Sequence, residues 1–367
     1  MAFLNHGGDV YGVARRRGVP VSCILDFSAN INPLGLTTKT LRRLERELPL
    51  VRHYPDKQQA ELRRLVASKE KVDPTCILFG NGTTQLLHLI ARCLKPRKAL
   101  TIEPGFSEYR AALRCSGCKI REFRLLSETG FRFEINDFLQ TLKREQPALI
   151  ILGNPNNPTG ALARRSALAK LVALCVKRRI HLVLDESFID FTAQPSLAAS
   201  AARQPYLIVV RSLTKFFALA GLRIGYLLAE TSLVKKLAGS LEPWSVNTLA
   251  LAAAAEAIKD SAYRHRSLAL IRKEREFLAA GLAKLGWLEV FPSEANFLLV
   301  RIRAANISSS ELQQRLELKN ILIRDAGDFP GLGPQYFRLA IRDRNDNRIL
   351  LKELNAVGCS LNGGRRR

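Results

Sequence analysis

Short apolar runs recur along the first two thirds of the chain, and longer stretches of mixed polarity separate them. The runs are too short for helices and are rich in Val, Ile and Leu, so they indicate buried β-strands. The expected strands are 76–79, 99–102, 148–152, 181–184, 207–210 and 224–228, and the expected helices between them include 84–94, 107–116 and 164–177. This alternation predicts an α/β domain, with a mostly parallel sheet and helices on both faces.

Polar segments follow several of these strands directly. Residues 81, 154–160, 185 and 212–215 all stand at or just after the end of an expected strand. Open α/β sheets bind their ligands at the edge where the strands end. We therefore expect a binding site that gathers these four segments.

The last third of the chain predicts a second, smaller α+β domain. An alanine-rich stretch, 249–285, is expected to form a long helix with one break that leads into it. Beyond it we expect strands at 297–300, 321–323 and 336–341 around a helix at 309–318. The predicted organisation is an N-terminal arm that joins the small domain (1–33), a large domain (34–269), the small domain (270–358) and a disordered tail (359–367).

Composition narrows the class of protein only slightly. The chain has 367 residues, of which 47% are hydrophobic and 25% charged, as in ordinary globular proteins. No apolar run reaches the ~20 residues of a membrane-spanning helix, and the first nine residues do not resemble a secretory signal. Cys115 and Cys118 have the spacing of a metal or redox pair, but no second pair accompanies them. We expect a cytoplasmic protein without a structural metal.

The formal net charge of +24 raises the possibility of nucleic-acid binding. The basic residues are nevertheless scattered through the chain, in short groups such as 15–17, 177–179 and 365–367, without interleaved aromatic residues. We therefore expect neither a nucleic-acid nor a membrane partner. The charge also favours an anionic small-molecule substrate, although its overall size has no explanation in the sequence.

Four polar residues suggest a specific cofactor. Asn157, Asp185, Lys215 and Arg223 follow one another near strand ends. A lysine can form a Schiff base with an aldehyde, and an aspartate can hold a pyridine nitrogen protonated. An asparagine can bind a ring hydroxyl, and an arginine with Ser212 can bind a phosphate. Each alone could be a surface or capping residue, but together they indicate a site for pyridoxal 5'-phosphate.

Two glycine-containing segments fit the same interpretation. Residues 80–84, Gly-Asn-Gly-Thr-Thr, follow a strand and open a helix, so their backbone N–H groups could hold a phosphate. On its own this segment could be an ordinary turn. Residues 154–160, Asn-Pro-Asn-Asn-Pro-Thr-Gly, must form a rigid loop. A plain turn would explain the prolines and the glycine of this loop but not its three asparagines.

With these motifs, the chain resembles the fold-type I pyridoxal phosphate enzymes, in the branch that contains the histidinol-phosphate aminotransferases. Within that branch it is most similar to the threonine-phosphate decarboxylases of cobalamin biosynthesis, from His6 to about Gly358. Phe106 and Phe188 stand where the aminotransferases commonly carry tyrosine. The decarboxylase-like segments are 6–8, 25–35, 53–56, 104–109, 185–191, 243–247 and 321–324.

The resemblance implies roles for the matching positions. Lys215 would be the Schiff-base lysine and Asp185 the partner of the pyridine nitrogen, and these two would be the catalytic residues. The cofactor would also be held by Asn157, Gly82, Thr83, Phe106, Ser212, Arg223 and, from the other subunit of a homodimer, Tyr54. The substrate would be held by Arg338 at its carboxylate, by His6, Gly7, Asn30 and Arg324 at its phosphate, and by Asn157.

The activity that the resemblance implies is decarboxylation of L-threonine O-3-phosphate to (R)-1-amino-2-propanol O-2-phosphate. An aminotransferase of the histidinol-phosphate type is the alternative, because the cofactor serves all three bonds at Cα and substrate orientation selects among them. A more distant alternative is a non-catalytic nucleic-acid-binding protein with a degenerate enzyme fold. It predicts a broken cofactor site, whereas all four cofactor residues are intact.

Overall fold

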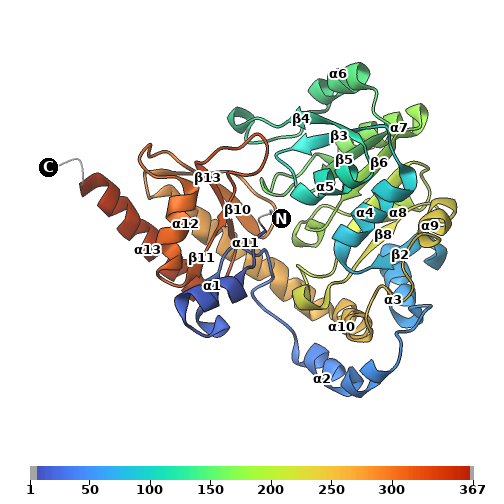
Figure 1. The fold of residues 1–367 in the computed structure, drawn as a ribbon, viewed down its shortest axis with the longest axis horizontal. Coiled ribbons are helices and arrows are strands. Elements are labelled where there is room, and N and C mark those ends of the chain that lie inside the picture. The colour runs from blue at the N-terminus through green and yellow to red at the C-terminus, as the bar shows by residue number, and fades with distance from the viewer. Residues whose placement is uncertain (1–5, 364–367) are drawn as a thin grey trace.

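A seven-stranded sheet forms the centre of the large part of the molecule in the computed structural model, which describes residues 6–363 (Figure 1). Its strand order is β2-β8-β7-β6-β5-β3-β4, and all strands except β8 run in the same direction. The prediction of a mostly parallel sheet is therefore confirmed. The strands are β2 (Ile77–Gly80), β3 (Lys98–Glu103), β4 (Lys119–Arg124), β5 (Leu149–Gly153), β6 (His181–Asp185), β7 (Leu207–Ser212) and β8 (Gly225–Leu228).

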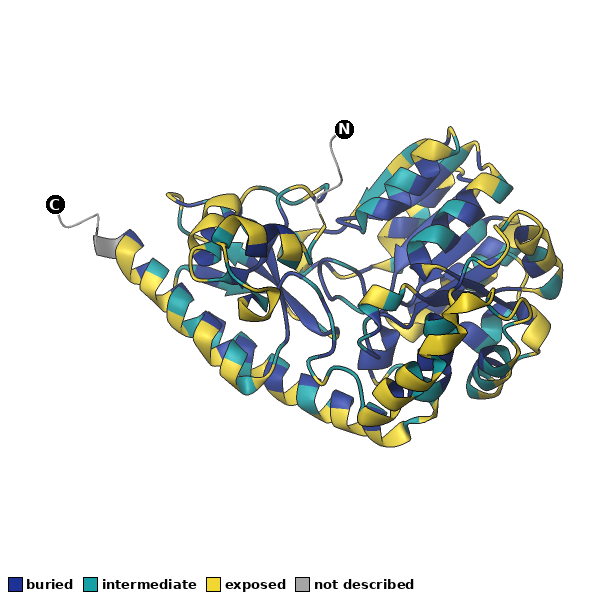
Figure 2. Ribbon diagram, turned by 60° about the horizontal axis from the view of Figure 1, so that its bottom comes forward, coloured by how far each residue is buried: buried dark blue, intermediate teal, exposed yellow. Residues whose placement is uncertain are grey.

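Helices cover both faces of this sheet. Alternate residues of β5 point to opposite sides, so that Leu149 and Ile151 join one hydrophobic layer and Ile150 and Leu152 the other. Strands buried on both faces have continuous apolar sequences, and Figure 2 shows these strands dark blue between the helices. One layer contains α4 (Gly82–Leu94), α5 (Ser107–Cys115) and α9 (Thr231–Ala238), and the other contains α6 (Ile135–Glu145), α7 (Arg165–Arg178) and α8 (Ala198–Ala201).

Because strand β8 runs opposite to β7, the candidate residues Lys215 and Arg223 lie at the same edge of the sheet. Residues 213–224 connect β7 to β8 with only a short turn of 3-10 helix, Ala220–Leu222. A parallel strand would need a longer crossover, usually an α-helix. The chain instead turns back beside β7, so the segment with Lys215 and Arg223 stays at the carboxyl end of β7.

A smaller antiparallel sheet lies in the other part of the molecule, in the order β12-β13-β10-β9. The N-terminal arm joins this part, because β1 (Leu25–Asp26) pairs with β11 (Ile321–Leu322). The small sheet consists of β9 (Leu288–Val290), β10 (Phe297–Ile302), β12 (Arg324–Asp325) and β13 (Tyr336–Ala340), and the nearby helices are α1 (Val10–Arg17), α11 (Ser261–Ala283), α12 (Ser309–Glu317) and α13 (Arg344–Gly363).

The expected broken helix is confirmed as α10 (Thr248–Lys259) and α11. The break falls at Asp260, whose side chain accepts a hydrogen bond from the backbone N–H of Tyr263 and so caps α11. Figure 1 shows α11 running from the large part to the small part of the molecule. Helix α10 packs against α2 (Thr38–Glu47) and α3 (Ala60–Glu70).

The disordered tail predicted from Cys359 is wrong for residues 359–363. Helix α13 continues through Gly363, and the side chain of Leu361 is buried against the core, in register with Leu354 one heptad earlier. Residues 364–367 lie outside the described part of the chain. The division into an arm, a large domain and a small domain stays a prediction.

Within residues 6–363, no helix is long and apolar enough to cross a membrane. The described residues also contain no group of three or more His, Cys, Asp or Glu side chains that could hold a metal ion.

Candidate active site

A cavity of about 680 Å³ opens where the N-terminal arm, the large sheet and the small sheet meet. A smaller cavity of about 50 Å³ adjoins it and reaches Asp185 at the end of β6. Of the predicted residues, the larger cavity is lined by His6, Gly7, Asn30, Thr83, Phe106, Asn157, Lys215, Arg223, Arg324 and Arg338. The structure thus brings together most of the predicted site, although these residues are scattered over more than 300 positions of sequence.

Lys215 lies in the turn after β7, and its side chain is partly buried. Its Nζ donates a hydrogen bond to the Oγ of Ser212 at 3.1 Å. Burial has the largest effect on the pKa of Lys215 and lowers it against the opposing effect of Asp185. Together with the smaller contributions of Arg223 and Arg338, burial brings this pKa to about 8. A substantial fraction of the amine is therefore neutral near physiological pH, as a nucleophile requires.

Asp185 is held in place by two residues that the sequence did not single out. Its Oδ1 accepts hydrogen bonds from the backbone N–H and the hydroxyl of Ser187, at 2.9 and 2.5 Å. Its Oδ2 accepts one from the hydroxyl of Tyr109 at 2.8 Å. Burial and the charge of Asp185 raise the pKa of Tyr109 well above its ordinary value, so the tyrosine remains a neutral donor. The only signal for these two residues was their place in segments 104–109 and 185–191.

The start of α4 and the end of the turn at Arg223 form a cradle for an anion. Gly82 has a φ of +77°, and a Cβ at this position would lie 2.7 Å from Nη2 of Arg223. Only glycine allows the guanidinium to approach the helix N-terminus so closely. The hydroxyls of Ser212 and Thr214 lie 2.8 Å apart beside Lys215. Helix N–H groups, hydroxyls and a guanidinium together suit a phosphate.

Residues 154–160 use their three asparagines in different ways. The side chain of Asn154 accepts a hydrogen bond from the N–H of Ala163 at 2.9 Å. Asn156 donates to the carbonyl of Pro104 at 2.9 Å, so both residues hold the loop. Asn157 instead lines the cavity and accepts a hydrogen bond from Arg338. Two of the asparagines thus stabilise the loop and the third faces the cavity, which explains why a plain turn could not account for the segment.

Two arginines face the cavity from the small sheet. Arg338, on β13, also donates to the carbonyl of Ser28 at 2.7 Å, and burial, with a smaller contribution from Arg324, lowers its pKa to about 9. Arg324, on β12, is 4% exposed, and its Nη2 lies 2.9 and 2.8 Å from the two carboxylate oxygens of Asp328. Nε of Arg338 and Oδ1 of Asn30 are buried with no hydrogen-bond partner among residues 6–363.

The N-terminal arm closes one side of the cavity. A Cβ at Gly7 would lie 2.2 Å from the carbonyl oxygen of Ser28, so a larger residue could not follow this path. The N–H of Gly8 donates to the hydroxyl of Ser28 at 2.7 Å. The arm thereby brings His6 to the rim of the cavity, near Phe106, whose ring centroid is 5.9 Å away.

Tyr54 is the predicted residue that lies away from this cavity. Its side chain is 78% exposed and stacks on Trp244, with ring centroids 4.4 Å apart. It lines a separate surface depression with Arg52, His53 and Asn247. A single chain therefore does not bring Tyr54 to Lys215, and its role across a subunit interface stays a prediction.

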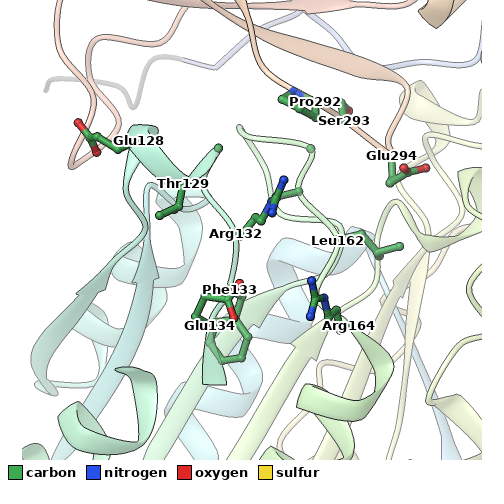
Figure 3. A pocket seen from close by; sticks show the side chains of 13 residues that line it. Glu128, Thr129, Arg132, Phe133, Glu134, Leu162, Arg164, Pro292, Ser293 and Glu294 are labelled. Atoms are coloured by element: carbon green, nitrogen blue, oxygen red, sulfur yellow. The ribbon is translucent and has the colours of Figure 1, made fainter. Parts of the chain in front are cut away.

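A second cavity, of about 560 Å³, lies elsewhere between the two parts of the molecule (Figure 3). Figure 3 shows Arg132 and Arg164 on one side and Pro292, Ser293 and Glu294 on the other. None of the predicted site residues lines it, and its glutamates and arginines carry opposing charges. The cavity of Lys215 is therefore the candidate active site.

The residues around Lys215 fit pyridoxal 5'-phosphate. The Gly82–Arg223 cradle can hold its phosphate, Asp185 can pair with its pyridine nitrogen, and Asn157 can bind its ring hydroxyl. Fold and site together define the class of fold-type I pyridoxal phosphate enzymes.

Comparison with known proteins leads to the same class. The family model of aminotransferase class I and II matches residues 23–354. Threonine-phosphate decarboxylase of Salmonella typhimurium is 38% identical over 361 residues, which cover 97% of this chain and 98% of that protein. The chain belongs to the aminotransferase class I and II family, whose cofactor is pyridoxal phosphate.

Two solved structures show the similarity in three dimensions. L-threonine-O-3-phosphate decarboxylase from Porphyromonas gingivalis has a TM-score of 0.82 and 28% identity, covering 91% of this chain and 99% of that one. Histidinol-phosphate aminotransferase from Clostridium acetobutylicum has a TM-score of 0.85 and 30% identity, covering 92% and 100%. The shared fold is thus common to decarboxylases and aminotransferases.

Proposed function

We propose that the protein is a pyridoxal phosphate-dependent lyase that decarboxylates L-threonine O-3-phosphate to (R)-1-amino-2-propanol O-2-phosphate in cobalamin biosynthesis. The observation that carries this proposal is the pair of buried arginines, Arg324 and Arg338, in the cavity of Lys215. Two separate guanidinium groups suit a substrate with two anionic groups, a carboxylate and a phosphate. The similarity to the decarboxylase of Salmonella typhimurium supports the same substrate.

The residues of the site have distinct tasks in this reaction. When bound, the cofactor withdraws electrons from Cα of the substrate amine. Arg338 would hold the carboxylate of the substrate and so orient the bond between Cα and the carboxylate carbon for cleavage. Asp185 would keep the pyridine nitrogen protonated, and Phe106 would pack on the ring. Lys215 would return a proton to Cα after carbon dioxide leaves.

At the other end of the substrate, the phosphate is held by Arg324, His6, Gly7 and Asn30. These groups fix the molecule from the end opposite to its carboxylate. Two-point fixation selects which bond at Cα is aligned for cleavage. It also explains why a phosphorylated substrate suits this cavity better than a plain amino acid.

Transamination at the same site is the second candidate, because histidinol-phosphate aminotransferases share this fold. A non-catalytic nucleic-acid-binding role is disfavoured by the complete cofactor site. Incubation of the protein, pyridoxal phosphate and threonine phosphate with and without a keto-acid acceptor separates the reactions. We expect 1-amino-2-propanol phosphate in equal amounts with or without the acceptor. Consumption of the acceptor without release of carbon dioxide would instead identify an aminotransferase.

We further propose a cytoplasmic homodimer. Exposed apolar side chains lie beside Tyr54: Val51 lines the same surface depression, and Trp244 stacks on the tyrosine ring. Such a cluster on one face is typical of an interface between copies of a chain. In the dimer, Tyr54 of one subunit would reach the cofactor phosphate of the other.

A further inference from the structure

A carboxylate between two histidines lies at the rim of the active-site cavity. Oε1 of Glu108 is 2.9 Å from Nε2 of His6, and Oε2 of the same carboxylate is 3.5 Å from Nε2 of His88. Glu108 and His6 both line the cavity of Lys215, but they come from α5 and from the N-terminal arm. The contact between them therefore bridges two segments about 100 positions apart in sequence.

Glu108 is a poor candidate for an ordinary surface acid. The residue is only 8% exposed. It stands in the first turn of α5, where the helix favours a negative charge. The hydrogen bond with His6 lowers its pKa, despite the opposing effect of burial. The carboxylate is therefore ionised at neutral pH and can only accept hydrogen bonds.

This geometry determines which atom His6 offers to a ligand. Because the ionised carboxylate accepts, Nε2 of His6 must carry the hydrogen, and Nδ1 is the ring nitrogen left for another partner. The contact with Glu108 thus fixes the imidazole at the rim of the cavity, where the phosphate group of a ligand can reach it.

We propose that Glu108 is a positioning residue that orients His6 to bind the phosphate of the substrate. His88 supports Glu108 from its other oxygen and does not itself contact the ligand. The inference rests on the proposed function, since it takes the ligand to be a phosphorylated amino acid. It assigns Glu108 to specificity for the phosphate and not to the reaction at Cα.

The test is steady-state kinetics of Glu108→Ala with threonine phosphate. The KM for threonine phosphate should rise about tenfold, with kcat little changed, because a charge-assisted contact to the substrate is weakened. The inhibition constant of inorganic phosphate should rise by a similar factor. Activity on unphosphorylated threonine should stay the same. Glu108→Gln should raise the KM by about threefold, since it keeps the shape but loses the charge.

A double-mutant cycle with His6→Ala separates positioning from a purely structural role. If Glu108 acts through His6, then Glu108→Ala has no further effect on KM in the His6→Ala background. The matched control is Glu122 on β4, which pairs with Arg110 on α5, the helix that also carries Glu108. Neither Glu122 nor Arg110 lines the cavity, so Glu122→Gln should leave KM unchanged.

Three results would overturn the proposal. The first is an unchanged KM in both Glu108 variants. The second is a rise in KM on Glu108→Ala that is equal in the wild-type and His6→Ala backgrounds. The third is a fall in kcat of the Glu108 variants without a change in KM. Thermal unfolding of each variant identifies those that are destabilised, and Glu108→Gln carries the test if Glu108→Ala does not fold. If the wild-type protein itself releases no carbon dioxide from threonine phosphate, the proposed function fails instead.

Discussion

At the scale of single residues, Arg324 and Arg338 make different contacts, so replacing each with alanine should affect activity in a different way. We expect Arg324→Ala to lower kcat/KM for threonine phosphate by an amount equivalent to ~1.5–3 kcal/mol, because one charge-assisted contact to the phosphate is lost. Activity on plain threonine should barely change. Steady-state kinetics with both substrates measures the difference.

Arg338→Ala is the comparison for that variant. It should impair both substrates, since each carries the carboxylate that Arg338 is proposed to bind. Equal losses on both substrates in Arg324→Ala would show that Arg324 does not recognise the phosphate.

Lys215 leads to a prediction about pH. Burial places its pKa at about 8, below the ordinary value of 10.5, so in the apoprotein the amine is protonated below about pH 8 and neutral above it. Only the neutral amine can attack the cofactor aldehyde. The rate of cofactor uptake by the apoprotein, followed by visible absorbance, should rise through pH 8 and then level off. A rate that keeps rising to pH 10 would contradict the low pKa.

The residues of the site were predictable to different degrees. Asp185 and Lys215 stand at or after strand ends and Arg223 stands just before a strand, so strand pattern and side-chain chemistry together were enough to find them. His6, Asn30 and Arg324 are distant in sequence and have no local signal of their own, so only the resemblance to a family pointed to them. Tyr109 and Glu108 act by contacting other site residues, and such contacts depend on tertiary structure.

At the scale of elements, strand β7 ends at the candidate site and also carries Arg211, the centre of a buried network of charged side chains. Arg211, 2% exposed, lies 2.7 Å from Asp190, 3.4 Å from Glu70 and 3.8 Å from Glu186. Asp190 also pairs with Lys69 and Arg264, but Arg211 is the cation that all three carboxylates share. Removing it would break this buried network, at a cost of ~3–5 kcal/mol.

Arg211→Met should therefore lower the free energy of unfolding by about that amount, as measured by urea denaturation. Arg272→Met is the matched control, because Arg272 forms an exposed pair with Glu276, one turn along α11. The control should change stability by less than ~0.5 kcal/mol. Similar effects of the two substitutions would show that the network contributes little.

Burial also decided which elements the sequence could predict. Strands β5, β6 and β7 are buried on both faces, and their apolar runs predict them directly. Strand β4 is an edge strand with alternating charged residues, so its pattern resembles an exposed segment. The last turns of α13 contain glycines and polar residues and suggested disorder, but Leu361 packs on the core.

At the scale of the whole molecule, the proposed homodimer completes the site. Sedimentation should give a mass of twice the 40.9 kDa chain. Tyr54→Phe should weaken binding of pyridoxal phosphate about tenfold, because a hydroxyl contact to a charged phosphate is lost. Trp244→Phe keeps the aromatic stack on Tyr54 and serves as the control, with affinity unchanged. A monomer with full cofactor affinity would contradict the role of Tyr54.

The central claim is that the bond between Cα and the carboxylate breaks and that a proton takes its place. The most direct measurement is a reaction in deuterated water with threonine phosphate labelled with carbon-13 at the carboxylate. We predict labelled carbon dioxide and an equal amount of 1-amino-2-propanol phosphate with one deuterium at the former Cα, without any keto acid. Retention of the label in the organic product, with transfer of the amino group to an added acceptor, would contradict the account.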